Sequence, residues 1–147
     1  MKKILALDLA TVTGWANDSA TGSENFKKRA GDSRGMLFIR FEAWLNEMTT
    51  IQGKPELIVY ERPHARGRAA TEVSHGLLAI LQKVCASNGV EYSDCPSTTL
   101  KKFATGKGNA GKPDMMEHYR RQWRAEPVDD NECDARWLHA WAQEQFN

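Results

Sequence analysis

Three carboxylates occupy positions where the neighbouring residues are apolar. Asp8 interrupts the apolar segment at residues 3–9, Glu61 ends the segment ELIVYE, and Asp134 lies among apolar neighbours in a helical segment. An ionised carboxylate that leaves water needs a cation, a metal ion or several hydrogen-bond donors. We therefore predict that the three converge on one metal site. For each one alone, a structural role remains the alternative, with backbone donors satisfying Asp8 or the adjacent Arg62 neutralising Glu61.

The chemistry that such a site favours is phosphodiester hydrolysis. Magnesium takes oxygen ligands in octahedral geometry, and a pair of such ions can hold the attacking and leaving oxygens of a phosphodiester. The sequence has no HExxH motif and no P-loop. Its three cysteines, Cys85, Cys95 and Cys133, lack the paired spacing of a zinc site, so we expect reduced thiols.

The segment DDNECDA holds the candidates for a fourth ligand. A helix turns by about 100° per residue, so Asp130, four residues before Asp134, and Asn131, three before it, can share its face. Glu132 points away, and Asp129 is expected to be a loop or cap residue. The alternative is that Asp129 and Asp130 only cap the helix and favour its positive dipole end.

The segments around these residues alternate between strand and helix patterns. We expect a buried strand at 3–9 and, over residues 4–29 as a whole, a strand followed by a hairpin, with the pairing beyond residue 20 left open. Further strands are predicted at 56–61 and 90–95. Helices are predicted from Ser33 to Met48, over 69–87, from a Ser97 cap through Phe103, from Pro113 or Asp114 to Trp123, and over 130–145.

This order predicts a single α/β domain over residues 1–147, with a mixed central sheet flanked by helices. No segment approaches the ~20 apolar residues of a membrane span, and residues 1–14 lack the apolar length of a signal peptide. We therefore expect no membrane partner and a cytoplasmic location.

The charges divide along the chain. Residues 61–124 hold 11 basic and 6 acidic side chains, whereas residues 125–147 hold 1 basic and 6 acidic. The formal net charge of +1 does not by itself indicate a nucleic-acid partner, and this distribution is more informative than the total. Two differently charged solvated surfaces are the alternative.

Four segments in this order, LALDLATVTGWA, LIVYERP, TGKGNAGK and DDNECDA, resemble the RuvC Holliday-junction resolvases, especially the short forms found in bacteriophages. The resemblance runs through nearly the whole chain. It implies an RNase H-like fold, Mg²⁺ as the cofactor with Mn²⁺ able to substitute, and a homodimer that nicks two strands of a four-way DNA junction symmetrically.

Residue by residue, the resemblance implies that Asp8, Glu61 and Asp134 are catalytic metal ligands. The family commonly has an acidic residue three positions before the last Asp, and here that position is Asn131. Asp130, the neighbouring residue, is the expected substitute as a fourth catalytic ligand.

The resemblance also implies a DNA-binding surface. Lys112 matches a catalytic lysine near the scissile phosphate, at the end of a glycine-rich stretch where glycines permit close approach to phosphate. The position that faces the junction centre in the family is His64, whose imidazole can stack on bases. The remaining cations expected to contact DNA phosphates are Arg62, Arg66, Arg68, Lys101, Lys102 and Lys107. An ordinary solvated basic loop is the alternative for both segments.

Three other functions compete with junction resolution. The first is a nucleotide-binding module, because the segment DLATVTGWA also resembles the first phosphate-binding hairpin of the actin and Hsp70 superfamily. Those proteins duplicate the fold around the nucleotide, whereas this chain has room for one copy. A noncatalytic junction-binding protein is a second alternative, because of Asn131. A YqgF-like nuclease acting on RNA precursors is the third.

Overall fold

The computed structural model describes residues 1–51, 53–63 and 67–147. Its strands are β1 (Ile4–Asp8), β2 (Val12–Ala16), β3 (Thr21–Asn25), β4 (Leu57–Glu61) and β5 (Glu91–Cys95). Its helices are α1 (Arg34–Thr50), α2 (Arg68–Asn88), α3 (Ser97–Thr105), α4 (Lys112–Trp123) and α5 (Asp130–Phe146). None of these helices combines the length and apolar character that a membrane crossing needs.

The described residues form one five-stranded mixed sheet in the order β3-β2-β1-β4-β5. β2 pairs antiparallel with both β1 and β3, whereas β4 pairs parallel with both β1 and β5. The hairpin predicted to reach residue 29 thus consists of β2 and β3, joined at residues 17–20. The predicted α/β class with a mixed central sheet is confirmed.

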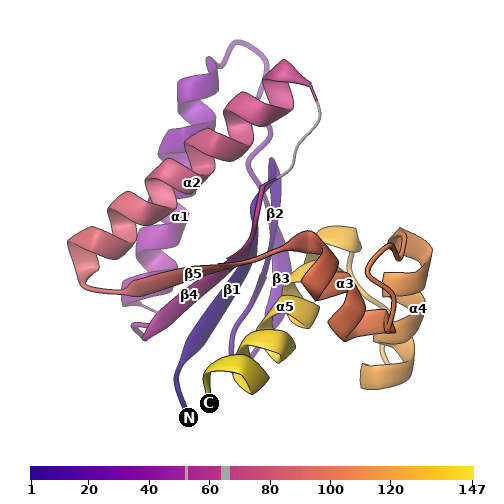
Figure 1. The fold of residues 1–147 in the computed structure, drawn as a ribbon. Helices are drawn as coiled ribbons and strands as arrows, with labels where there is room; N and C mark the ends of the chain where they lie inside the picture. Colours follow the sequence, from indigo (N-terminus) through magenta and orange to yellow (C-terminus); the bar gives the residue numbers. More distant parts are fainter. Residues whose placement is uncertain (52, 64–66) are drawn as a thin grey trace.

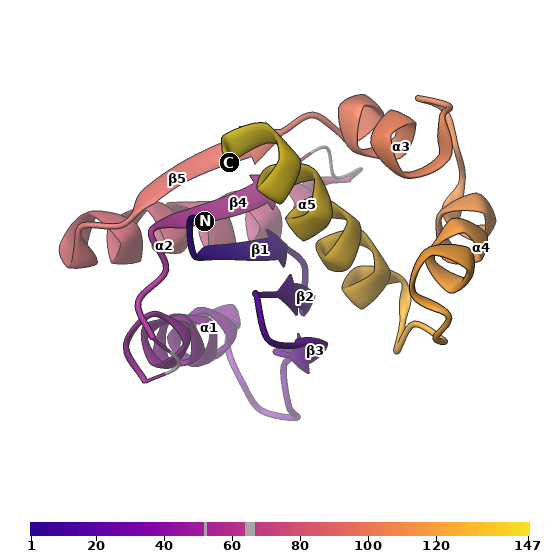
Figure 2. The same ribbon diagram turned by 90° about the horizontal axis from the view of Figure 1, so that it is seen from below.

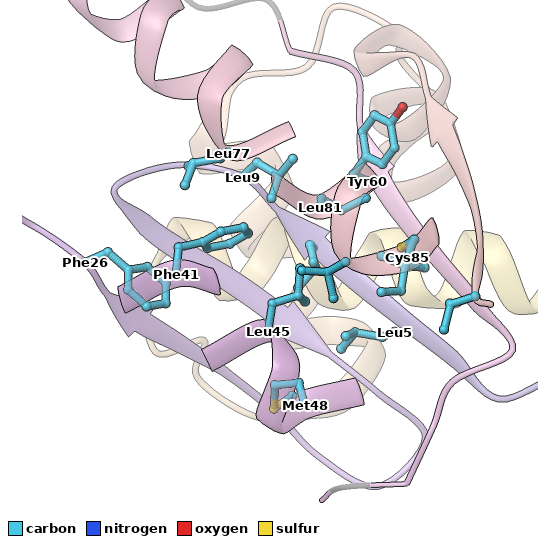
Figure 3. Close-up of a cluster of buried hydrophobic side chains, with 14 of the residues drawn as sticks. Leu5, Leu9, Phe26, Phe41, Leu45, Met48, Tyr60, Leu77, Leu81 and Cys85 are labelled. Atoms are coloured by element: carbon cyan, nitrogen blue, oxygen red, sulfur yellow. The ribbon is translucent and has the colours of Figure 1, made fainter. Parts of the chain in front are cut away.

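Helices cover both faces of the sheet (Figures 1 and 2). Helices α1 and α2 pack on one face, where Leu5, Leu45 and Leu81 belong to a cluster of buried side chains (Figure 3). Helix α5 crosses the other face, and α3 and α4 contact it. A second cluster of buried side chains fills this face, and it includes the fully buried Leu138 of α5.

The alternation of side chains along β1 and β4 decides which face carries the acidic residues. Leu5 and Leu7 point to the α1–α2 face, so Ile4, Ala6 and Asp8 point to the α5 face. The same alternation places Leu57 and Val59 on the α5 face, and with them Glu61. Because Leu7 is in register with Tyr60, Asp8 and Glu61 are the next pair along the two strands.

Two predicted details change. Ser97 was expected to cap its helix, but the cap is Pro96 and Ser97 is the first helical residue. Proline suits that position because its fixed φ and missing N–H cost a helix start nothing. Helix α4 begins at Lys112, one residue before the predicted start at Pro113, which places Lys112 in the first turn.

Candidate metal centre

Three carboxylates meet at the carboxyl ends of β1 and β4. One oxygen from each of Asp8, Glu61 and Asp134 lies within 4.8 Å of the others, and all three residues are partly buried. Within the residues that the structure describes, they form the one group of His, Cys, Asp or Glu close enough to share a cation. The predicted convergence of these three residues is therefore observed.

The electrostatics of the group favour either protonation of its carboxyls or a bound cation. Burial raises the pKa of Asp8 well above its usual range, and the nearby carboxylates of Asp134 and Glu61 raise it further. Burial, with the charges of Glu61 and Asp130, raises the pKa of Asp134 to about 7. Like charges held together out of water favour protonation, unless a cation neutralises them. An all-oxygen donor set of this kind suits a hard divalent cation.

Asp130 lies at the edge of this group. It is the first residue of α5, and its carboxylate accepts a 2.7 Å ion-pair contact from Lys112 Nζ. Asp130 and Asp134 line the same cavity of about 350 Å³ as Asp8 and Glu61. Asp130 is thus close enough to repel the triad, although it is not among the three carboxylates that converge.

The other members of DDNECDA have separate positions. Asp129 is the N-cap of α5 and accepts a 2.8 Å hydrogen bond from the Glu132 backbone N–H, as expected of a cap residue. Asn131 lines the cavity beside the triad. Glu132 points away from the cavity and is fully buried, with its carboxylate accepting hydrogen bonds from Tyr119 Oη at 2.8 and 3.0 Å.

The packing of α5 against β2 depends on Gly14. A Cβ atom on this glycine would lie 1.9 Å from the carbonyl oxygen of Asn131. Since Gly14 is in register with Asp8, the first turn of α5 can approach the strand that neighbours Asp8. The sequence showed this glycine within the TGWA motif but carried no signal for its partner, which lies more than 110 residues later.

Lys112 and Lys101 lie beside the triad, and Arg62 lines an adjoining cavity with Asp8 and Glu61. Both lysines line the 350 Å³ cavity, Lys101 from α3 and Lys112 from α4. Gly111, which precedes Lys112, lines it too, and Gly106 ends α3 with a φ of 87° that glycine adopts without strain. The glycine-rich stretch therefore folds back onto the acidic site.

The other predicted DNA-binding residues are spread over a wider surface. Lys102 faces a separate pocket with Phe103 and Trp141, while Lys107 is exposed in the α3–α4 loop. Arg62 Nε donates a 2.8 Å hydrogen bond to Asp94, and Arg68 Nε donates a 3.1 Å bond to Glu72. His64 and Arg66 lie outside the described residues.

Ser97 also lies at the site, although the sequence did not predict it there. Its hydroxyl is buried and has no hydrogen-bond partner among the described residues, and the residue lines the cavity with Asp8 and Glu61. The one signal in the sequence was its place at a helix start, which suggested a cap instead.

The structure thus combines a mixed sheet, a carboxylate cluster where two of its central strands end, and an acidic helix packed across that face. No protein-family model matches the sequence, and no curated protein matches it. Solved structures do. The structure of Thermus thermophilus RuvC in complex with a Holliday junction substrate matches with a TM-score of 0.80 at 17% identity, covering 99% of this chain and 96% of that one.

Two further structures agree. Thermus thermophilus RuvC by itself matches with a TM-score of 0.77 at 17% identity, over 97% of this chain and 96% of that one. The yeast mitochondrial Holliday junction resolvase Ydc2 matches with a TM-score of 0.66 at 12% identity, over 95% of this chain and 76% of that one. The chain thus has the fold of the RuvC Holliday junction resolvases, as its sequence motifs predicted.

Proposed function

We propose that this protein is a divalent-metal-dependent endonuclease that resolves four-way and other branched DNA junctions by phosphodiester hydrolysis. The observation that carries the proposal is the convergence of Asp8, Glu61 and Asp134 in a chain with the RuvC fold. A buried set of like charges destabilises a protein that never binds a cation. A structural neighbour of matching length binds a Holliday junction substrate.

Each acidic residue has a part in the proposed reaction. Asp8, Glu61 and Asp134 would hold the metal, and Asp130 would add a fourth oxygen from the start of α5. When bound, Mg²⁺, or Mn²⁺ in its place, supplies electrophilic stabilisation of the charge that develops on the phosphodiester. The carboxylates must lose their protons to bind it, so metal affinity should rise with pH through the raised pKa values of Asp8 and Asp134.

Lys112 would act on the phosphate. The Asp130 carboxylate raises the pKa of Lys112, so its ammonium stays charged beside the cavity. Its side chain is 79% exposed, which leaves it able to turn from Asp130 to a phosphate oxygen. A fixed positive charge at that point stabilises the charge that builds up in the transition state.

Binding of the DNA itself would depend on the surrounding cations. Contacts from Lys and Arg to phosphates give affinity and salt dependence without reading sequence. The residues that we assign to this role are Arg62, His64, Arg66, Arg68, Lys101, Lys102, Lys107 and Lys112. Symmetric cleavage of two strands requires two centres, so we also propose a homodimer, which light scattering of the purified protein would test.

The test is cleavage of labelled four-way junction, fork and linear duplex DNA, with and without Mg²⁺. Asp8→Asn and Asp134→Asn each remove a charged ligand, and both should abolish nicking while the protein stays folded. Glu47→Gln is a matched control, because Glu47 is an exposed acidic residue of α1 on the far side of the sheet. This control should cleave at the unaltered rate.

The outcomes are distinct. Metal-dependent nicking of branched DNA that both active-site variants lose would support the proposal. Cleavage that survives Asp8→Asn would contradict it. Structured RNA tested beside the junction would show whether the enzyme prefers RNA, and tight junction binding without cleavage under any metal would indicate a noncatalytic role.

A further inference from the structure

The loop between β3 and α1 displays a second group of positive charges. Lys27, Lys28 and Arg29 are consecutive and exposed, and residues 26–40 together hold five basic side chains and one acidic one. That acidic residue, Asp32, is already engaged, since its carboxylate accepts a 2.6 Å contact from Arg40. The charge of Arg29 also acts on Asp32, but among the described residues Lys27, Lys28 and Arg29 form no side-chain ion pair.

The conformation of this loop is specified by hydrogen bonds at both ends. The backbone N–H of Lys27 donates to Asn25 Oδ1 at 2.9 Å, and that of Arg29 donates to Asp32 Oδ2 at 3.0 Å. Between β3 and the cations, Phe26 is buried, with its ring 5.5 Å from those of Phe41 and Trp44. The loop is thus anchored in the core and turns its charges outward.

The loop lies at the same end of the sheet as the metal centre. Asp8 is in register with Gly14 and Gly14 with Ser23, so Lys27 follows four residues beyond the level of Asp8. Figure 1 shows the β3–α1 connection and the first turn of α2 at one end of the molecule. The Phe26 N–H donates to the Thr11 carbonyl at 2.7 Å, and Thr11 lines a pocket with Asp8 and Glu61.

The lateral separation suits DNA. β3 is two strands away from β1, which amounts to about 10 Å at the usual strand spacing. Successive phosphates of one strand rise about 3.4 Å along a duplex, so this span corresponds to about three nucleotides. Lys101 and Lys112 lie on the other side of the centre, on helices that follow the opposite edge strand β5.

We propose that Lys27, Lys28 and Arg29 bind the sugar-phosphate backbone of one duplex arm, a few nucleotides from the scissile phosphate. The inference rests on the proposed function, because it takes the bound molecule to be branched DNA. Residues 27–29 lie on one side of the metal centre, and Lys101 and Lys112 lie on the other. Each group would therefore hold a different arm of the junction as the arms diverge from the crossover. This contact contributes affinity and orientation and takes no part in the chemical step.

The test compares two charge-matched triple variants in the inactive Asp8→Asn background. The loop variant replaces residues 27, 28 and 29 with alanine. The control variant replaces Lys2, Lys3 and Lys54 with alanine. These lysines lie near the amino-terminal end of β1, away from the carboxylates at its other end. Binding of a labelled four-way junction is measured by fluorescence anisotropy between about 50 and about 200 mM KCl.

The loop variant should bind about tenfold or more weakly at the lower salt concentration. Its plot of log affinity against log salt should be shallower by about two to three, since each phosphate contact contributes about 0.9 to the slope. Hydroxyl-radical footprints should lose protection about three nucleotides from the cleavage site, and the control should keep all three properties. A loop variant with the parent's affinity and slope, or a control that weakens equally, would overturn the inference.

Cleavage separates this inference from the proposed function. With an intact Asp8, the loop variant at saturating protein should nick the junction at the parent's single-turnover rate, within about twofold, because the contact acts on binding alone. A parent that binds the junction but never nicks it would refute the proposed activity and leave the binding comparison valid. A saturating rate that falls as far as the affinity would refute the assignment of the loop to binding.

Discussion

Replacing Asp134 with Asn should make the metal-free protein more stable at pH 8. The carboxyl ionises near its ordinary pKa of 3.8 in the unfolded chain, but burial and the charges of Glu61 and Asp130 raise its pKa to about 7 in the folded chain. Three pKa units correspond to about 4 kcal/mol. Water in the adjoining cavity screens part of the repulsion, so we expect a gain of about 2–4 kcal/mol.

The sign of the pH dependence follows from the same two values. Below the unfolded pKa both states hold the proton, and the variant has no advantage. As pH rises from about 4 to about 7, the unfolded chain loses its proton while the folded chain retains it, so the parent's free energy of unfolding falls. Above the folded pKa both states are ionised and the difference stays constant. The advantage of Asp134→Asn should therefore grow between pH 4 and 7 and then level off.

The assay is urea and thermal unfolding in EDTA, followed by tryptophan fluorescence. A gain of that size corresponds to about 5–15 °C in Tm for a domain of this length. Added Mg²⁺ should raise the Tm of the parent and not that of the variant, because only the parent retains all three ligands. Glu47→Gln serves as the control and should follow the parent throughout. An Asp134→Asn protein less stable than the parent at pH 8 in EDTA would refute the reasoning.

Three further substitutions test other contacts of the site. Lys112→Met should change stability by less than about 1 kcal/mol, because its ion pair is exposed, yet lower the single-turnover cleavage rate about 10²–10³-fold; an unaltered rate would exclude the catalytic role. Gly14→Ala should cost about 1–3 kcal/mol in urea unfolding by displacing α5, whereas Gly35→Ala, whose nearest neighbour is a side chain at 3.4 Å, should cost nothing. Tyr119→Phe should cost about 1–3 kcal/mol by removing a donor from buried Glu132, and a loss within experimental error in urea unfolding would show that the carboxylate finds other donors.

Local patterns predicted the acidic triad, because each of the three carboxylates stands out within its own segment. Asp8 interrupts one apolar run and Glu61 ends another, and Asp134 has apolar neighbours in its helix. The residue at the edge of the site was harder to assign. Helical spacing allowed Asp130 to share the face of Asp134, but its contact with Lys112 depends on how α4 meets α5, which no single segment encodes.

Two neighbouring lysines of α3 also show that local spacing does not determine which side chain faces the site. Lys101 and Lys102 are both predicted DNA contacts, but one residue of helix turns the side chain by about 100°. Lys101 therefore lines the cavity with the triad, while Lys102 faces a pocket with Trp141. Which of the two would face the site depends on the packing of α3 against α5. Tertiary contacts of this kind cannot be derived from the spacing within one helix.

Two contacts that hold the start of α5 explain how the repelling carboxylates are kept together. Repulsion between Asp134 and the strand carboxylates favours moving the helix away from the sheet. The close approach at Gly14 fits the first turn of α5 tightly against β2, and the Glu132–Tyr119 hydrogen bonds join the same turn to α4. These interactions elsewhere in the fold offset part of the repulsion between the carboxylates. A cation bound by the proposed site would relieve the repulsion that remains.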